Sequence, residues 1–318
     1  MVIFQFLLLL VGFVILIKGA DFLVRGSSSI AKKFGISNIV IGLTIVAFGT
    51  SAPELIVNIM ASIKGSSEIV MGNVVGSNIA NILLILGISA MICPLIVKKS
   101  TTRIEIPFAL LAFLVLATVA NDIFIDNGVA NFVTRIDGII MILFFIIFLY
   151  YTFSISKANG DSGQVEKLST LKSIIFIIGG ILALTLGGNF VVKSAIIIAM
   201  YWGVSESLIA LTIVSIGTSL PELATSVVAA LKKNPDIAIG NVVGSNIFNI
   251  FWILGLSAII RPVFLDPIMN IDILFGVFIT ILLFGYMFIG KKNVVQRWQG
   301  ASMVVLYVGY IVYLVIRG

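Results

Sequence analysis

The sequence predicts an all-α polytopic membrane protein with ten transmembrane helices, arranged as two inverted repeats of five helices each. Three observations carry this prediction: the composition, the recurrence of long apolar segments, and a motif that occurs twice. Of the 318 residues, 60% are hydrophobic and 11% are charged, and the mean hydropathy is +1.21. A water-soluble domain of this length carries much more charge on its surface.

Apolar segments of about 18 residues or more, long enough to cross a bilayer, recur along the whole chain. The first begins at Ile3 without a preceding basic region and continues past the length of a signal peptide, so we interpret it as a membrane helix. The ten expected spans cover residues 3–31, 37–63, 68–97, 104–121, 134–154, 171–199, 204–231, 236–260, 268–290 and 296–316.

One polar connector interrupts this pattern near the middle of the chain, at residues 154–170. Its glycines, serines and charged residues are typical of a flexible linker. We therefore expect a first repeat at residues 1–153, a linker at 154–170 and a second repeat at 171–318.

A shift of 168 residues aligns the two halves without a gap from Gly12 to Pro94. The segment GTSAPEL at 49–55 returns as GTSLPEL at 217–223, and GNVVGSNIAN at 72–81 returns as GNVVGSNIFN at 240–249. Only one position differs in each segment. Such a long match indicates an internal structural repeat.

Five spans in each repeat require the second repeat to enter the membrane from the opposite side, an arrangement common in secondary transporters. Lysines and arginines favour the cytoplasmic side of a membrane. If both termini are extracellular and the 154–170 linker is cytoplasmic, the outer loops and ends hold only Lys64, Arg135, Arg261 and Arg317. We therefore expect this orientation in the cell membrane.

The composition also excludes several functions. The chain has no histidine and a single cysteine, Cys93, which removes histidine-based and cysteine-based metal sites and Ser-His-Asp catalysis. We expect no enzymatic activity and no cofactor. The net charge of +6 reflects the inner loops rather than a nucleic-acid partner, because no basic stripe with interleaved aromatics occurs. The expected partner is the lipid bilayer; the oligomeric state is left open, with a monomer sufficient for transport.

Glu54 and Glu222 lie at the centres of the second and seventh spans. A charge at that depth costs roughly 2.5–3.5 kcal/mol on insertion scales, so a carboxylate there normally faces a partner or a water-filled path. A glycine and a proline close to each glutamate are expected to break both helices and to free backbone carbonyl groups, which membrane proteins tolerate where these groups line a cavity or bind a ligand.

Further oxygen donors surround the two glutamates. The pairs that share a helix face at a spacing of four residues are Thr50 with Glu54, Ser77 with Asn81, and Ser245 with Asn249. Carboxylate, hydroxyl and amide oxygens suit hard cations, of which calcium takes roughly six to eight oxygen ligands. One Ca²⁺ neutralises two ionised glutamates, whereas an empty site would hold a proton or Na⁺ instead. Such competition is a physical basis for ion exchange.

These two motifs resemble the alpha repeats of the Na⁺/Ca²⁺ exchanger family, within the cation/Ca²⁺ antiporter superfamily, in its prokaryotic form without regulatory domains. The resemblance implies that Glu54 and Glu222 bind Ca²⁺ with help from Thr50 and Thr218. It further implies electrogenic exchange of Na⁺ for Ca²⁺ by alternating access. The residues that it implies around the sodium sites are Ala47, Ser51, Ser77, Ala210, Ser215, Ser219 and Ser245.

Potassium-dependent members of the superfamily often carry an aspartate where this chain has Asn249. Because Asn81 and Asn249 are both neutral amides, we expect transport to be independent of K⁺. The linker is also too short to hold the regulatory calcium-binding domains of animal exchangers, so we expect no such regulation.

Two alternative functions remain open. A Ca²⁺/H⁺ antiporter of the same superfamily could exchange protons for Ca²⁺ at the two glutamates, although the surrounding serines favour sodium. A cation channel could use an acidic ring, although the inverted repeat argues against it.

Two features of the first span have competing interpretations. Gly12, Gly19 and Gly26 recur every seven residues and match Gly180, Gly187 and Ser194 of the sixth span. Such a stripe allows close helix packing, and could also form a smooth face along which the two spans slide. A cluster of charges at Lys18, Asp21 and Arg25 has no full counterpart in the second half, so we expect an internal ion pair rather than a role in transport.

Overall fold

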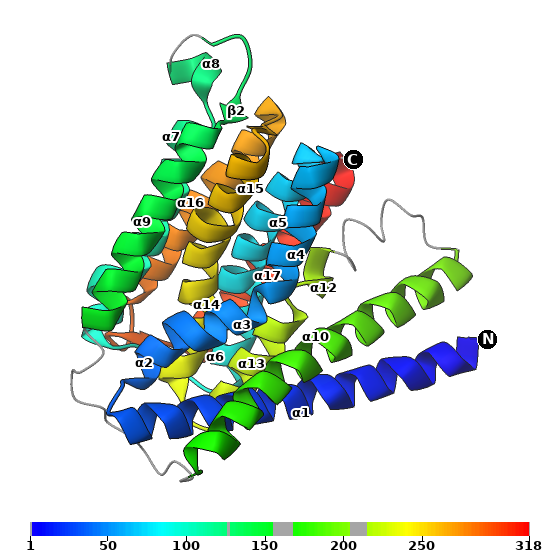
Figure 1. The fold of residues 1–318 in the computed structure, drawn as a ribbon, viewed down its shortest axis with the longest axis vertical. Helices are drawn as coiled ribbons and strands as arrows, with labels where there is room; N and C mark the ends of the chain where they lie inside the picture. Colours follow the sequence, from blue (N-terminus) through cyan, green and yellow to red (C-terminus); the bar gives the residue numbers. More distant parts are fainter. Residues whose placement is uncertain (1, 126–127, 155–167, 204–214, 318) are drawn as a thin grey trace.

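The computed structural model describes residues 2–125, 128–154, 168–203 and 215–317, which form a helical bundle (Figure 1). The elements of the first half, in order, are α1 (Val2–Phe34), α2 (Asn38–Ile41), η1 (Gly42–Val46), α3 (Ala47–Thr50), α4 (Ala52–Lys64), α5 (Ser67–Ala80), η2 (Asn81–Leu86), α6 (Gly87–Ile92), β1 (Leu95–Ile96), η3 (Thr101–Glu105), α7 (Ile106–Val119), α8 (Asp122–Ile125), β2 (Phe132–Val133) and α9 (Arg135–Ser154).

The second half largely repeats this order. Its described elements are α10 (Thr170–Tyr201), α12 (Ser215–Gly217), α13 (Leu220–Leu231), α14 (Pro235–Ile247), η5 (Phe248–Leu254), α15 (Gly255–Ile260), β3 (Val263–Phe264), η6 (Pro267–Met269), α16 (Asn270–Tyr286), β4 (Val294–Val295) and α17 (Arg297–Arg317). The segments η1, η2, η3 and η5 are π-helical, and η6 is a 3₁₀-helix.

Eight helical segments of the described residues are long and apolar enough to cross a membrane. The bent pair Asn38–Thr50 and Ala52–Lys64 adds a ninth. The predicted span at 204–231 is described only from Ser215 onward, because residues 204–214 lie outside the described part of the chain. The multi-pass helical fold is therefore confirmed, and the tenth span stays a prediction.

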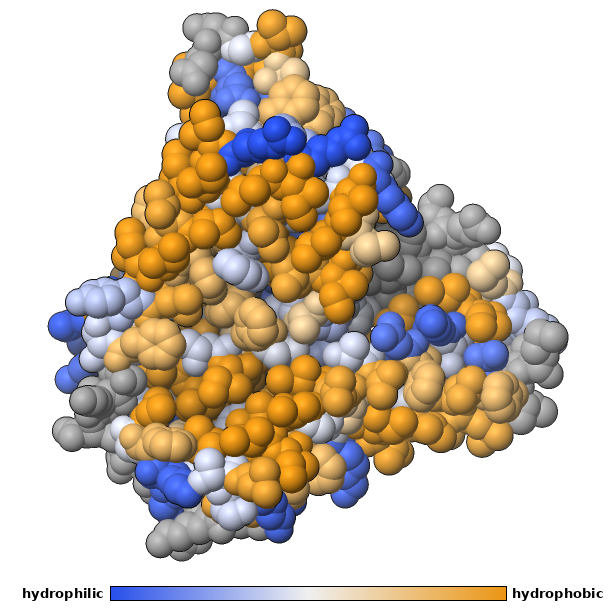
Figure 2. Space-filling model, in the orientation of Figure 1, coloured by the Kyte–Doolittle hydropathy of each residue, from blue (hydrophilic) through white to orange (hydrophobic). Residues whose placement is uncertain are grey.

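The surface of the molecule has the polarity expected of a protein in lipid. Figure 2 shows apolar side chains covering most of one face, with hydrophilic residues gathered in separate groups. Large exposed apolar side chains occur along α1, α9 and α10, including Leu10, Val14, Leu143, Ile147 and Leu182. A contiguous apolar surface of this extent marks contact with a membrane.

Two segments form the interior of the bundle. In Ser67–Ile92 and Pro235–Ile260, 72% and 78% of the most apolar window is buried, whereas the other membrane-spanning helices have 28–39% buried. These two segments contain the second motif of each repeat. The motif residues are therefore placed at the centre of the protein, away from lipid.

The helix α1 packs mainly against α10, and the two run side by side across one side of the bundle (Figure 1). The glycine stripe forms this contact. A Cβ atom on Gly19 would lie 2.9 Å from the backbone nitrogen of Leu184, and one on Gly187 would lie 2.8 Å from the backbone nitrogen of Leu16. The predicted close packing is confirmed, since no side chain larger than hydrogen fits without displacing a helix.

The predicted ion pair on α1 is also present, and it extends to a second helix. Arg25 Nη1 lies 3.3 Å from Asp21 Oδ2. Lys232, at the end of α13, pairs with the other carboxylate oxygen of Asp21. The pair therefore connects α1 to the end of one of the two helices that carry the glutamates.

The all-α prediction needs one small correction. The described residues contain four strands of two residues each, which form the antiparallel pairs β1–β4 and β2–β3. Each pair joins one strand from each half of the chain. The pairs satisfy backbone groups of the connections between helices. Each pair joins a connection of the first half to a connection of the second half.

Candidate ion-binding site

Both helices that carry the central glutamates break at a serine. Ser51 separates α3 from α4, with φ −82° and ψ 7°, and the helices before and after it bend by 48°. Ser219 precedes α13 with nearly the same backbone angles, φ −86° and ψ 5°. In each case the proline two residues later lies in the first turn of the new helix, where its missing N–H costs nothing. The expected helix breaks are therefore present.

The next residue in each copy is the glutamate, and both glutamates are buried. Glu54 and Glu222 are 2% and 1% exposed. Each lies in the first turn of its helix, where the positive end of the helix dipole stabilises a carboxylate.

Hydrogen bonds between the halves bring the two carboxylates to a common site. Ser51 Oγ donates to Glu222 Oε1 at 2.9 Å, and Ser219 Oγ donates to Glu54 Oε1 at 3.5 Å. Ser51 Oγ also lies 3.0 Å from Ser245 Oγ. The helix break of each half therefore holds the glutamate of the other half.

The two predicted threonines contact asparagines of the opposite half. Thr50 Oγ1 donates to Asn241 Oδ1 at 2.9 Å, and Thr218 Oγ1 donates to Asn73 Oδ1 at 3.3 Å. The amide groups of these asparagines donate in turn to the backbone oxygens of Glu222, at 3.3 Å, and of Glu54, at 3.5 Å. The threonines and asparagines thus position the first turns of the two glutamate helices.

Asn73 and Asn241 were not among the predicted site residues. A signal for them existed, because both belong to the repeated GNVVGSN segment and occupy equivalent positions. Their side chains also bond within their own halves, to Asn58 Oδ1 at 2.7 Å and to Ser226 Oγ at 3.0 Å.

Four further asparagines connect the two interior segments. Asn78 and Asn246 each donate to the backbone oxygen of the other, at 3.2 and 3.3 Å. Asn81 Nδ2 donates to Asn246 Oδ1 and Asn249 Nδ2 donates to Asn78 Oδ1, both at 2.9 Å. The amide nitrogens of Asn81 and Asn249 are used in these bonds, whereas their Oδ1 atoms have no partner within the described part of the chain. Asn81 opens η2 and Asn249 lies in η5, and π-helical turns often occur at functional sites.

Several buried oxygen atoms of the predicted site residues have no hydrogen-bond partner among the described residues. They are Glu54 Oε2, Glu222 Oε2, Ser77 Oγ, Asn81 Oδ1 and Asn249 Oδ1. An unsatisfied buried polar group costs about 1–3 kcal/mol, and more when it is charged. Carboxylate, hydroxyl and amide oxygens are the ligands that Ca²⁺ and Na⁺ accept, so this set of atoms fits a hard cation as cargo.

The remaining predicted residues have mixed outcomes. Ala47 is fully buried, and its carbonyl oxygen accepts from Thr50 Oγ1 at 3.3 Å and from the Ser51 backbone nitrogen at 3.0 Å. Ser245 contacts Ser51, as described above. Ala210 lies outside the described residues, as does the side chain of Ser215 at the start of α12.

Comparison with known proteins gives a consistent result. The model of the family described as "Sodium/calcium exchanger protein" matches residues 4–154 and 172–316. The sodium/calcium exchanger MaX1 of Methanosarcina acetivorans is 37% identical, over 99% of both chains. The putative antiporter CaxA of Alkalimonas amylolytica is 36% identical, over 95% of both chains.

A solved structure matches this chain in fold as well as in sequence. The sodium-calcium exchanger NCX_Mj, soaked with 10 mM Na⁺ and zero Ca²⁺, superposes with a TM-score of 0.84 at 33% identity, covering 98% of this chain and 99% of that one. These matches extend over nearly the whole chain and include both glutamate motifs. The protein therefore belongs to the sodium/calcium exchanger family and is a multi-pass cation/Ca²⁺ antiporter.

Proposed function

We propose that this protein exchanges Na⁺ for Ca²⁺ across the cell membrane by alternating access, electrogenically and without a requirement for K⁺. The observation that carries the proposal is that buried oxygens of Glu54, Glu222, Ser77, Asn81 and Asn249 have no hydrogen-bond partner among the described residues. Na⁺ as the coupling ion is supported by two similar proteins that align with nearly the whole chain and are named sodium/calcium exchangers.

The geometry explains why the two ions would exclude each other. The two carboxylates share one small site, with Ser51 bonded to Glu222 and Ser219 bonded to Glu54. Two like charges in a buried site need positive charge nearby, and one Ca²⁺ or several Na⁺ can provide it. The serine hydroxyls and the Ala47 carbonyl add neutral oxygens for Na⁺. Because the ions use the same carboxylates, occupancy by one would release the other.

We further propose that the halves are inverted repeats, at 1–153 and 171–318, with the 154–170 linker in the cytoplasm and both termini outside. The reciprocal hydrogen bonds support the symmetry, since the bonds that the threonines, the asparagines of the interior segments and the serines beside the glutamates make between the halves recur with a shift of 168 residues. The two stretches that match the family model lie on either side of the linker, which supports the same division.

The independence from K⁺ rests on Asn81 and Asn249. Both side chains are neutral, and each uses its nitrogen to bind the opposite half. Neither position adds a carboxylate for a further cation. An aspartate at either position would add a negative charge beside the two glutamates and a place for K⁺.

The test is uptake of ⁴⁵Ca²⁺ into Na⁺-loaded proteoliposomes that are diluted into K⁺-free medium with or without Na⁺. We expect uptake only when Na⁺ is inside the vesicles and absent outside. Uptake should be faster when the membrane potential is positive inside, because the export of several Na⁺ for each Ca²⁺ moves net positive charge out of the vesicle. A proton gradient alone should drive none. Uptake driven by protons but not by Na⁺ would instead establish the Ca²⁺/H⁺ alternative, and a requirement for K⁺ would contradict the independence from K⁺.

Two glutamine variants test the site. We expect Glu54→Gln and Glu222→Gln each to reduce exchange by about two orders of magnitude or more, because one carboxylate cannot neutralise Ca²⁺ in a buried site. Glu105→Gln is the matched control. Glu105 is also fully buried, but it accepts a hydrogen bond from Tyr151 at 2.8 Å, and a glutamine can accept the same bond. Exchange retained in both central variants would overturn the site assignment.

A further inference from the structure

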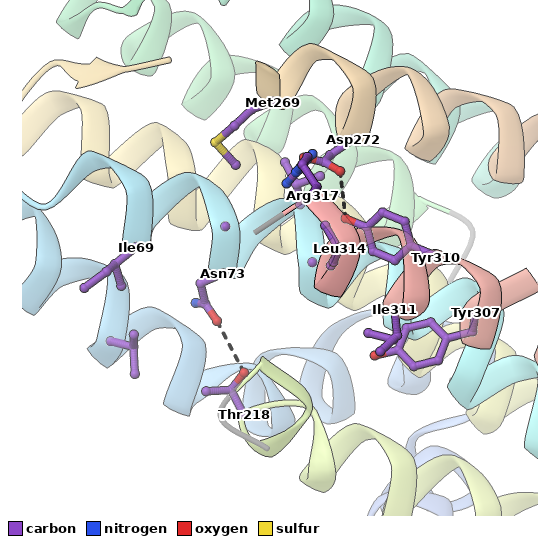
Figure 3. Close-up of a pocket in the computed structure, with 14 residues that line it drawn as sticks. Ile69, Asn73, Thr218, Met269, Asp272, Tyr307, Tyr310, Ile311, Leu314 and Arg317 are labelled. Atoms are coloured by element: carbon purple, nitrogen blue, oxygen red, sulfur yellow. Dashed lines mark hydrogen bonds and ion pairs between the residues drawn. The ribbon is translucent and has the colours of Figure 1, made fainter. Parts of the chain in front are cut away.

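A cavity of about 420 Å³ lies next to the ion site, between α4, α5, α16 and α17 (Figure 3). Its wall is mostly apolar and includes Ile69, Met269 and Leu314. Polar groups gather at two places on the wall. Asn73 and Thr218 form one group, and Asp272, Tyr310 and Arg317 form the other (Figure 3).

The first polar group connects the wall of the cavity to a helix that carries one of the glutamates. Thr218 Oγ1 donates to Asn73 Oδ1 at 3.3 Å, and the Asn73 amide reaches the backbone oxygen of Glu54 at 3.5 Å. Thr218 and Asn73 are both partly exposed. The side chain of Asn73 therefore connects the wall of the cavity to the backbone of Glu54.

The equivalent group in the other half is covered. Thr50 and Asn241 make the corresponding bond at 2.9 Å, and both side chains are fully buried. Gly72 lines the cavity, but a Cβ atom on its counterpart Gly240 would lie only 2.9 Å from the backbone oxygen of Ile39. Within the described part of the chain, Thr218 and Asn73 thus face a cavity on the side where Arg317 lies, whereas their counterparts Thr50 and Asn241 are covered.

The second polar group is an ion pair on the wall of the same cavity. Asp272 is 2% exposed, and its carboxylate accepts bonds from Tyr310 Oη at 3.0 Å and from Arg317 Nη1 at 2.8 Å. Arg317 lies in the last turn of α17, and its side chain is 21% exposed. Charges on the walls of a narrow apolar cleft concentrate or repel mobile ions far more effectively than charges on an open surface. As a pair, these two residues leave the cavity without net charge.

We propose that Asp272 is a receiving site for Na⁺ and Ca²⁺ on their way to Glu54, and that Arg317 is a tethered cation that competes with them for it. The inference rests on the proposed exchange function and deepens it. An arriving cation takes the place of the guanidinium group at Asp272, while Tyr310 keeps the carboxylate in position. The balance between the two residues then sets how fast cations are captured from this side.

A set of charge variants tests this role. Relative to the wild-type cavity, Arg317→Gln leaves one extra negative charge, Asp272→Asn leaves one extra positive charge, and the double variant leaves neither. The measurement is the initial rate of Na⁺-driven ⁴⁵Ca²⁺ uptake at subsaturating Ca²⁺, in right-side-out membrane vesicles at low ionic strength.

We expect the rate to follow the cavity charge: fastest in Arg317→Gln, intermediate and similar in the wild type and the double variant, and slowest in Asp272→Asn. The extremes should differ by on the order of tenfold. The differences should shrink at high ionic strength and at saturating Ca²⁺, because salt screens the field and saturation removes the dependence on capture. In inside-out vesicles loaded with saturating Na⁺ the four rates should agree, because Ca²⁺ then enters from the opposite side and capture of Na⁺ no longer limits the rate. Arg317→Lys keeps the charge and should resemble the wild type.

Other outcomes would contradict the proposal in different ways. If both single variants are slow and the double variant recovers, the pair has only a structural role. Equal rates in all four proteins would overturn this inference alone, whereas a wild type without Na⁺-driven uptake would overturn the proposed function.

A second measurement tests whether water reaches the cavity. In a Cys93→Ser background, Ile311→Cys should react from outside with a charged, membrane-impermeant thiol reagent, because Ile311 lines the cavity. Gly309→Cys, two residues away on the same helix, has open space beside its Cα and does not line the cavity, so it should react more slowly. Failure of Ile311→Cys to react faster than this control would show a lipid-filled hollow and overturn the proposed access route.

Discussion

At the scale of single residues, Ser51 and Ser219 occupy equivalent positions but hold the two glutamates differently. The Ser51 hydroxyl lies 2.9 Å from Glu222 Oε1, whereas the Ser219 hydroxyl lies 3.5 Å from Glu54 Oε1. Ser51 also contacts Ser245, which fixes its hydroxyl further. Hydrogen bonds to a charged oxygen are strong when short and weaken steeply as they lengthen. Glu222 is therefore held more firmly than Glu54 in this conformation.

This difference predicts unequal effects of two alanine substitutions. Removing a hydrogen bond to a charged group costs about 1.5–3 kcal/mol, so we expect Ser51→Ala to raise the half-saturating Ca²⁺ concentration by about tenfold or more. Ser219→Ala should raise it less, because its bond is longer. The check is ⁴⁵Ca²⁺ uptake as a function of Ca²⁺ concentration in both variants. A larger effect from Ser219→Ala would show that the two bonds exchange lengths when the ion binds.

The sequence could predict several residues that the structure brings together at the candidate site, but not all of their partners. The two glutamates, both threonines and Ser51 were identifiable because each lies in a motif that occurs twice. The bonds of Asn73 and Asn241 run between the halves, and a repeat shows which positions are equivalent without showing which ones touch. Asn58 and Ser226 are harder still, because the equivalent positions carry different residue types and match only in their ability to accept a hydrogen bond.

At the scale of helices, the contact between α1 and α10 is close at each glycine of the stripe. Cβ atoms on Gly12, Gly19 and Gly26 would each lie within 3.0 Å of an atom of α10. At these three positions α1 carries no side chain, so it lets α10 approach closely and offers few obstacles to sliding. This geometry is compatible with the interpretation of the pair as a moving element.

Bulky substitutions in this contact test that interpretation. We expect Gly19→Val and Gly187→Val to slow Na⁺/Ca²⁺ exchange severalfold while changing equilibrium Ca²⁺ binding much less, because neither residue touches the ion site. Gly179→Val is the matched control on α10, since a Cβ atom there meets open space. Exchange rates and Ca²⁺ binding isotherms would be measured for all three. A pure loss of binding in the first two variants would contradict a role in sliding.

Some elements carried no sequence signal. The strands β1 to β4 have two residues each, too few to show an alternating pattern. The predicted span at 268–290 was too long, because α16 ends at Tyr286. Gly290 and Asn293 adopt positive φ angles of 77° and 55° and form the turn toward α17, although the preceding residues are as apolar as the helix. Hydropathy alone could not separate this turn from the membrane span.

At the scale of the whole molecule, the proposed orientation gives a prediction about accessibility. In a Cys93→Ser background, a cysteine at Lys64 should react with a membrane-impermeant thiol reagent in intact cells. A cysteine at Lys99 should react only after the cells are permeabilised. Both lysines are exposed, so access to the side chain itself does not limit either reaction. The opposite labelling pattern would invert the proposed topology.

The reciprocal hydrogen bonds between the two halves have a consequence for how such a protein is assembled. Neither half contains a complete pocket: the first supplies the hydroxyl that holds Glu222, and the second supplies the one that holds Glu54. A half on its own would carry an uncompensated carboxylate into the membrane, so it is stable there only when the other half is present. The chain is in effect a dimer joined by a linker, and two separately expressed halves should be able to reconstitute one transporter.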